Sequence, residues 1–262
     1  MSARPTLLGI PYDASSSYLR GSAQAPPLIR RALASPSSNG WSESLRDASS
    51  IHDAGDIGVS GDNPRALISA AAEEILRAGD RPLTLGGDHS ITYPLLVAFR
   101  AHHPRLTILH IDAHADLYDE FEGDRFSHAC PFARVMENHL ADRLVQVGIR
   151  TLTPHLTEQA ERFGVEVIDM RAFASGQRPE VDGPVYLSLD LDALDPAFAP
   201  GVSHWEPGGL TTRDVITIIQ SLGGRLIGAD VVEYNPVRDP SGVTAMVAAK
   251  LVKEIASRML EE

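Results

Sequence analysis

The sequence predicts an α/β fold, a three-layer α/β/α arrangement in which a mainly parallel sheet lies between two layers of helices. Short runs rich in β-branched residues alternate along the chain with segments of helical periodicity. Acidic and histidine-containing motifs directly follow several of these runs, where ligand sites gather in open parallel sheets. No internal repeat or interdomain linker interrupts the pattern, so we expect residues 1–262 to form a single domain.

Seven stretches are predicted strands because they are short, apolar and bounded by turn residues. They are residues 6–10, 82–86, 106–112, 143–148, 165–169, 185–190 and 226–232. Two of them, 106–112 and 185–190, are nearly continuous apolar runs, which is typical of strands buried on both faces.

Six segments carry helical spacing between these strands. They are residues 64–79, 90–101, 128–140, 154–163, 211–222 and 242–260. Asn63 before Pro64 and the pair Thr211-Thr212 predict helix starts, with a capping side chain or a proline in the first turn. Residues 35–50 are rich in Ser, Asn and Gly, and we expect a surface loop there.

Composition excludes several classes of protein. The net charge of −12 argues against non-specific nucleic-acid binding and suits a cationic ligand. No apolar run is long enough to cross a bilayer, and no signal peptide is evident, so we expect a cytoplasmic protein with no membrane contact. The single cysteine, Cys130, excludes an intramolecular disulfide, and we interpret it as a packing residue.

Two acidic runs predict a metal centre. Asp112, His114 and Asp116 alternate after the apolar stretch 106–111, and Asp190 and Asp192 alternate after 185–189. In an extended strand, alternate side chains share a face, so each run is expected to converge on one point. Four crowded carboxylates repel one another, and two divalent cations would neutralise them.

The segment Gly86-Gly87-Asp88-His89-Ser90 adds a further ligand candidate. Its glycines allow a sharp turn after a strand, which would aim His89 into the site, while Asp88 is a candidate cap for the helix that follows. A donor set of carboxylates and imidazoles without thiolate favours Mn²⁺, with Co²⁺, Fe²⁺ or Zn²⁺ as substitutes. Paired metals can share a water and lower its pKa, which implies hydrolysis at an electrophilic carbon or phosphorus.

Four motifs resemble the signatures of the ureohydrolase family, which includes arginases, agmatinases and formimidoylglutamases. They are GGDHS at 86–90, DAHAD at 112–116, SLDLDALDPAFAPGV at 188–202 and ADVVEYNP at 229–236. The resemblance extends over nearly the whole chain. It implies an eight-stranded parallel sheet, two Mn²⁺ ions per subunit and a homo-oligomer, either a trimer or a hexamer.

The same resemblance implies roles for individual residues. One metal would be held by His89, Asp112, Asp116 and Asp190, and the other by His114, Asp112, Asp190 and Asp192. His128 matches the family's proton-shuttle histidine, and Glu233 matches the acid that pairs with the substrate guanidinium. A carboxylate suits that task because it accepts two parallel N–H bonds from a planar guanidinium.

The choice of guanidino substrate depends on the loop at 117–127. Its charged residues are Asp119, Glu120, Glu122, Asp124 and Arg125. An acidic loop favours a substrate that ends in an amine, so agmatine is the expected substrate, yielding putrescine and urea. The segments FSHACPFAR and 200–207 resemble plant-type arginases, so hydrolysis of arginine to ornithine and urea is an alternative, as is a guanidino-acid or formimino substrate.

Functions of another class remain as alternatives. A metal-dependent deacetylase shares this fold in outline but would not need all four aspartates or Glu233. A non-catalytic binding subunit would typically have lost a ligand position or His128, and both are present here. We therefore expect an enzyme, a metal-dependent hydrolase of C–N bonds in linear amidines.

Overall fold

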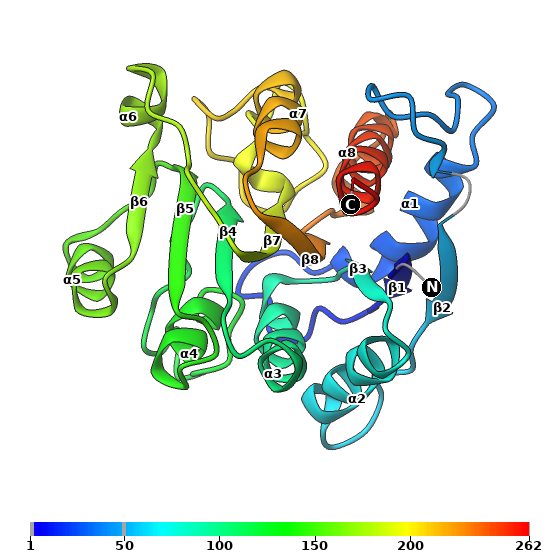
Figure 1. The fold of residues 1–262 in the computed structure, drawn as a ribbon. Coiled ribbons are helices and arrows are strands. Elements are labelled where there is room, and N and C mark those ends of the chain that lie inside the picture. The colour runs from blue at the N-terminus through cyan, green and yellow to red at the C-terminus, as the bar shows by residue number, and fades with distance from the viewer. Residues whose placement is uncertain (1–2, 49–50, 262) are drawn as a thin grey trace.

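The computed structural model describes residues 3–48 and 51–261. Eight strands form one sheet in the order β2-β1-β3-β8-β7-β4-β5-β6, and each neighbouring pair is parallel (Figure 1). The strands are β1 (Pro5–Gly9), β2 (His52–Asp56), β3 (Arg81–Leu85), β4 (Thr107–Ile111), β5 (Arg143–Ile149), β6 (Glu166–Asp169), β7 (Pro184–Asp190) and β8 (Arg225–Val232).

Helices cover both faces of this sheet, which confirms the predicted three-layer arrangement. One layer contains α1 (Ala25–Leu33), α6 (Met170–Ala174), α7 (Thr212–Ser221) and α8 (Val243–Met259) (Figure 1). The other contains α2 (Pro64–Arg77), α3 (Thr92–His102), α4 (Pro131–Glu137) and α5 (Pro154–Phe163).

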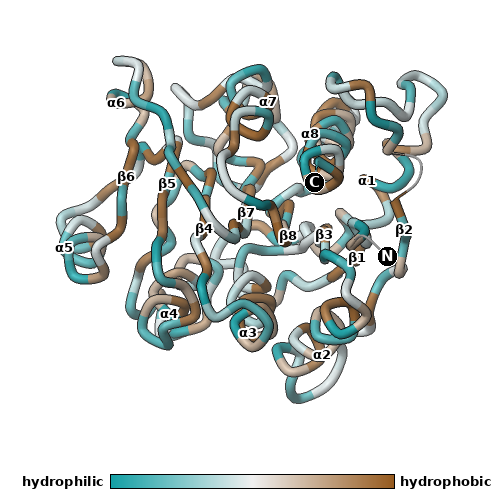
Figure 2. The backbone as a smooth tube through the Cα atoms, viewed as in Figure 1, coloured by the Kyte–Doolittle hydropathy of each residue, from teal (hydrophilic) through white to brown (hydrophobic). Residues whose placement is uncertain are grey.

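Two hydrophobic cores separate the three layers. Neighbouring residues of β4 point to opposite cores, Leu109 toward α7 and α8 and Ile108 toward α3 and α4. Both are buried, which explains why this strand is continuously apolar rather than alternating. In Figure 2 the hydrophobic residues gather along the central strands and on the helix sides that face them.

The seven predicted strands are all present, and the structure adds β2, which the residue pattern missed. Strand β2 has the polar sequence HDAGD and lies exposed at the sheet edge, so it lacks the apolar signal of a buried strand. Helix α1 was also missed, although Pro26 and Pro27 in its first turn are typical of a helix start. The helix expected over 128–140 is shorter, beginning at Pro131 and ending at Glu137.

The predicted helix starts have the expected caps. Asn63 accepts a hydrogen bond from the N–H of Ala66 at the start of α2. Thr211 and Asp214 form a reciprocal capping box at the start of α7. These local bonds satisfy backbone donors that the first helical turn leaves free.

Strand order brings the sequence motifs together. After β3 the chain crosses to β4 and leaves a gap that β8 and β7 later fill, so these four strands lie side by side at the sheet centre. Their register is level, with Leu189 of β7 opposite both Ile111 of β4 and Val231 of β8. The segments that leave their carboxyl ends therefore meet at one edge, where ligands bind in such sheets.

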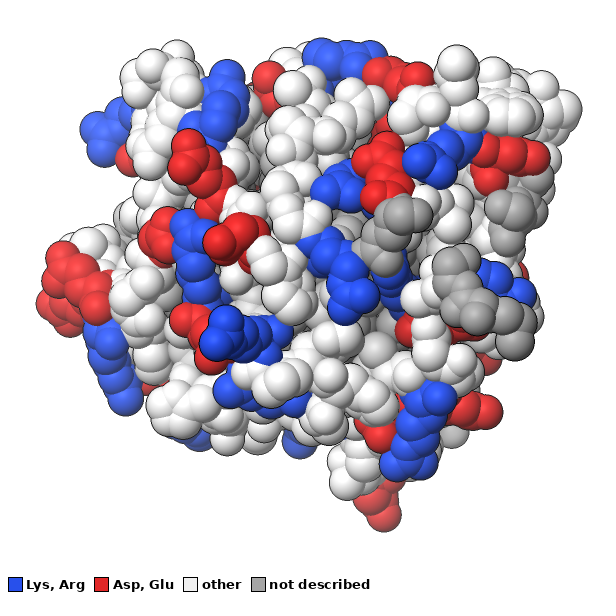
Figure 3. All heavy atoms as spheres, viewed as in Figure 1, with Lys and Arg blue, Asp and Glu red and all other residues white. Residues whose placement is uncertain are grey.

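The surface agrees with the composition. The expected loop at 35–50 is largely exposed over residues 35–48, while Ser49 and Ser50 lie outside the described residues. On the face seen in Figure 3, acidic and basic side chains are interspersed, without one continuous basic patch. Within the described ranges, no helix is long and apolar enough to cross a membrane.

Candidate metal centre and catalytic pocket

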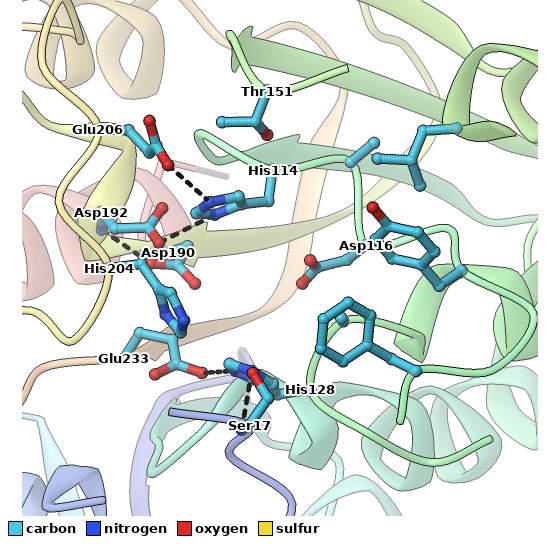
Figure 4. Close-up of a pocket in the computed structure, with 15 residues that line it drawn as sticks. Ser17, His114, Asp116, His128, Thr151, Asp190, Asp192, His204, Glu206 and Glu233 are labelled. Atoms are coloured by element: carbon cyan, nitrogen blue, oxygen red, sulfur yellow. Dashed lines mark hydrogen bonds and ion pairs between the residues drawn. The ribbon is translucent and has the colours of Figure 1, made fainter. Parts of the chain in front are cut away.

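A pocket of about 220 Å³ opens at the carboxyl ends of the central strands (Figure 4). Five carboxylates line it: Asp116, Asp190, Asp192, Glu206 and Glu233. Three histidines, His114, His128 and His204, share the lining, and none of the described residues that line the pocket is a lysine or arginine. The pocket therefore suits a cationic ligand.

His89 lies buried against Asp116 and Asp190 of this pocket, where a sharp turn after β3 places it. Asp88 accepts a hydrogen bond from the N–H of Ser90 and begins the short helix η3 (His89–Ile91), as expected of a cap. Gly87 has no room for a side chain, since a Cβ atom there would lie 1.7 Å from the carbonyl oxygen of Tyr12. Close backbone packing thus sets the direction of the His89 side chain.

Three carboxylates surround one nitrogen of His89. Its Nδ1 atom lies 3.1 Å from Asp112 Oδ2, 3.0 Å from Asp116 Oδ2 and 3.2 Å from Asp190 Oδ2. All four side chains are buried or nearly so. The structure thus brings together four of the predicted site residues, from the ends of β3, β4 and β7.

A second group forms around His114. Its Nδ1 atom lies 3.1 Å from Asp192 Oδ2 and 3.5 Å from Asp112 Oδ1. Asp112 therefore faces His89 with one carboxylate oxygen and His114 with the other. The six predicted ligand residues converge on two adjoining points that share Asp112.

The local geometry differs from the predicted strand alternation. Strand β4 ends at Ile111, and Asp112 then accepts a hydrogen bond from the N–H of His114, which makes a tight turn. Asp116 has a φ of 51°, in the left-handed region that residues other than glycine rarely adopt. Asp190 and Asp192 also separate, one facing His89 and the other His114. Turns, rather than one extended face, bring the ligand atoms together.

A buried relay orients His89 from behind. Ser188 donates its hydroxyl to Asp230 Oδ1 at 2.7 Å, so its oxygen accepts from His89 Nε2–H at 2.9 Å. Tyr186 and Thr92 donate to the other oxygen of Asp230 at 2.7 and 2.9 Å. This relay keeps a proton on Nε2, so that in the neutral ring the lone pair lies on Nδ1.

His110 supports Asp112 in a similar way and was not singled out from the sequence. Gln146 donates its amide to His110 Nδ1 and to the carbonyl oxygen of Ala115, so His110 carries its proton on Nε2. That proton is donated to Asp112 Oδ2 at 2.7 Å. His110 lies inside strand β4, where an isolated polar residue in an apolar run was the only available signal.

The geometry fits a pair of cations. His89 Nδ1 is buried and has no hydrogen-bond partner among the described residues, yet it faces three carboxylate oxygens. Ligands that bind a cation at about 2.1 Å, at right angles to one another, lie about 3.0 Å apart. Burial and the neighbouring carboxylates Asp192 and Asp112 raise the pKa of Asp190 well above its usual value. Without a positive charge, the crowded carboxylates therefore disfavour the ionised form of Asp190.

His128 and Glu233 face each other beside this centre. His128 Nδ1 donates to Glu233 Oε1 at 2.8 Å, and the same oxygen accepts the backbone N–H of His89. Burial opposes protonation of His128, but the Glu233 carboxylate outweighs it and raises the pKa of His128 to about 9. Glu233 has a φ of 63°, a second strained backbone position at the pocket.

Cys130 is buried close to this site but carries no sign of reactivity. Burial and the nearby Asp116 carboxylate raise the pKa of its thiol to about 12. A thiol with such a pKa stays protonated and is a poor nucleophile, as expected of a packing residue.

The loop at 117–127 presents aromatic side chains to the pocket, whereas its charge had suggested acidic ones. Tyr118 and Phe121 line the pocket, whereas Asp119 approaches Arg134 and Arg162 at 3.9 and 3.4 Å. Arg125 pairs with Glu137. The acidic residues on which the expectation of agmatine was based are therefore not among those that line the pocket.

Several further residues of the site carried no sequence signal that separated them from ordinary loop residues. Arg150 holds the pocket wall together by donating to the backbone carbonyls of Gly148, Asp192, Ala193, Leu194 and Glu206. His204 stands between His114 and His128, with ring centroids 5.7 and 5.3 Å away. Ser17 contacts His128 from the loop after β1.

Comparison with known proteins agrees with this geometry. The model of the arginase family matches residues 3–257. A relative named arginase 1, mitochondrial, from Arabidopsis thaliana is 47% identical over 280 residues, covering 98% of this chain and 81% of that protein. The structure of an arginase from Medicago truncatula has a TM-score of 0.94 at 44% identity, covering 98% of this chain and 88% of that one.

A more distant structure has a different description. A hypothetical agmatinase from Burkholderia thailandensis has a TM-score of 0.85 at 31% identity, covering 98% of this chain and 85% of that one.

The expectation of a cytoplasmic protein is contradicted, because the relatives from Arabidopsis, Medicago and rice have mitochondrial names. The composition on which that expectation was based does not determine the compartment.

Proposed function

The chain belongs to the arginase family, and we propose that it hydrolyses arginine to ornithine and urea with two manganese ions per subunit. The observation that carries the proposal is the convergence of six candidate ligands, four of which line one acidic pocket together with His128 and Glu233. The plant relatives named arginases support arginine rather than the agmatine expected from the loop charges.

We assign the ligands by their distances. The group around His89 Nδ1 would hold one ion through His89, Asp112, Asp116 and Asp190. The group around His114 Nδ1 would hold the other through His114, Asp112 and Asp192, and the motif resemblance adds Asp190 as a ligand shared by both ions. His110 is assigned to the outer layer, because its Nε2 proton is committed to Asp112.

The donor set favours manganese among divalent cations. Four carboxylates and two imidazoles provide mainly hard oxygen ligands and no thiolate. When bound, the two ions would supply the positive charge that ionises water near neutral pH.

The remaining chemistry belongs to Glu233 and His128. Glu233 is buried, and despite that burial the charge of His128 holds its pKa below the usual range, so it is an anion available to a guanidinium. The Glu233 carboxylate raises the pKa of His128 and so favours its protonated form, which would give its proton to the amine that leaves as urea forms.

Agmatine is the second candidate, and one observation favours it. The described residues that line the pocket include five carboxylates and no lysine or arginine to pair with a substrate carboxylate. Agmatine lacks that carboxylate, so its binding would not require such a partner.

The test is urea release from arginine, agmatine and guanidinobutyrate, each with excess Mn²⁺, with acetyl-lysine as a substrate of another class. The proposal predicts the highest kcat/KM with arginine. A higher kcat/KM with agmatine would support the second candidate. Hydrolysis of acetyl-lysine without urea release would support a deacetylase and refute both.

We further propose that residues 1–262 act as one catalytic domain and assemble as a homo-oligomer, a trimer or hexamer. The motif resemblance supports this assembly. Light scattering of the manganese-loaded protein would test it, and a monomeric mass would contradict it.

A further inference from the structure

The loop after β1 brings Ser17 against the ring nitrogen of His128 that does not face Glu233 (Figure 4). The Ser17 hydroxyl lies 2.8 Å from His128 Nε2, and the backbone nitrogen of Ser17 lies 3.2 Å from the same atom, to which its N–H can donate when the ring is neutral. The other nitrogen, Nδ1, is committed to Glu233. Nε2 is therefore the nitrogen at which His128 gains or loses a proton while its bond to Glu233 remains.

The position of Ser17 is fixed by its neighbours. Asp88 accepts the N–H of Ser15 at 2.9 Å, and the carbonyl oxygen of Ser15 accepts the backbone N–H of His128 at 3.1 Å. The loop is thus tied both to the turn after β3 and to the segment that carries His128. The backbone that carries Ser17 is therefore held in place before a substrate binds.

We propose that Ser17 is a positioning residue that holds His128 in both of its protonation states. The Ser17 N–H fills the lone pair of the neutral ring, and the Ser17 oxygen accepts the Nε2–H of the charged ring. The inference rests on the proposed role of His128 as proton donor. Without the hydroxyl, only a donor would remain at Nε2, and a donor opposes the protonated ring.

Other charges around His128 set the background for this effect. Glu233, Asp88 and Asp116 favour the charged ring, while burial and the neighbouring His204 oppose it. Substitution of Ser17 leaves all of these groups in place. A change in the proton affinity of His128 would then report the hydrogen bond at Nε2.

The test measures the pKa of His128 in the manganese-loaded protein, from the pH dependence of hydrogen exchange at its imidazole carbon, followed by mass spectrometry. Ser17→Ala is expected to lower this pKa by about one unit. Ser16→Ala is the matched control, since its hydroxyl lies on the same loop and contacts Asp88 rather than His128. Ser17→Thr and Ser17→Val, which have the same shape, provide a second comparison with and without the hydroxyl.

A second readout is the rate of urea release. Ser17→Ala and Ser17→Val are expected to lower kcat about tenfold with KM nearly unchanged, and Ser17→Thr to restore kcat. An unchanged pKa of His128 in Ser17→Ala, or an equal decrease in Ser16→Ala, would overturn the inference. If the unsubstituted protein released no urea from any guanidine, the proposed function would fail, while the pKa comparison would still decide the role of Ser17.

Discussion

His128 Nδ1 lies 2.8 Å from Glu233 Oε1, and that oxygen also accepts the backbone N–H of His89 at 2.9 Å. One carboxylate therefore connects the candidate proton donor to the turn that carries a candidate metal ligand. Movement of Glu233, whose backbone has a φ of 63°, would disturb both.

This pair predicts a pH dependence of stability. The pKa of His128 is raised to about 9, so its contribution to folding is fully present below pH 6.5 and is lost as the pH rises through about 9. In chelator-treated protein, the melting temperature should fall over this range in the unsubstituted chain and much less in Glu233→Gln. Glu206→Gln, at the pocket mouth, is the control, and parallel curves for all three proteins would refute the interpretation.

Removal of one carboxylate should release metal. Asp190→Asn leaves an amide 3.2 Å from His89 Nδ1, and we expect loss of bound manganese and of turnover, because an amide contributes no negative charge. Asp182→Asn, which alters a 94% exposed carboxylate just before β7, is the control. Metal content per chain by elemental analysis measures the effect. Full occupancy in Asp190→Asn would remove this residue from the centre.

Substitution of His128 should separate binding of metal from turnover. His128→Asn removes the proton donor but no assigned ligand, so manganese content should be normal while kcat decreases by about 100- to 10,000-fold. Urea release and metal analysis of the same sample provide the measurement. A normal rate would count against the assigned role.

The relay behind His89 can be tested with two hydroxyl deletions. Ser188→Ala and Tyr186→Phe each remove one hydrogen bond to Asp230, but only Ser188 also contacts His89. Ser188→Ala should weaken manganese binding about 10- to 100-fold. Tyr186→Phe should lower the free energy of unfolding by about 1 kcal/mol with little change in metal affinity. Equal effects on metal affinity would show that the relay does not act through His89.

Much of the central architecture could be predicted because its signals are local. The continuous apolar runs of β4 and β7 identified buried parallel strands, and the caps at Asn63 and Thr211 identified helix starts. Strand β2 could not be found in this way, since it is polar and lies at an exposed edge, and helix α1 was missed despite the prolines in its first turn. The acidic side chains of loop 117–127, on which the expectation of agmatine was based, do not line the pocket for a related reason. Net charge along a segment does not reveal which side chains turn away to pair with Arg134 and Arg162.

The linear order of residues was sufficient to identify the alternating fold and the acidic groups that require positive charge, because periodicity and motif spacing are properties of neighbours in the chain. Only the tertiary structure decided which oxygen faces which nitrogen. Ser17, His110, His204 and Asp230 come from different elements, and their contacts arise from strand order, tight turns and packing that no local pattern encodes. The division of Asp190 and Asp192 between His89 and His114 arises in the same way, from the turn at the end of β7.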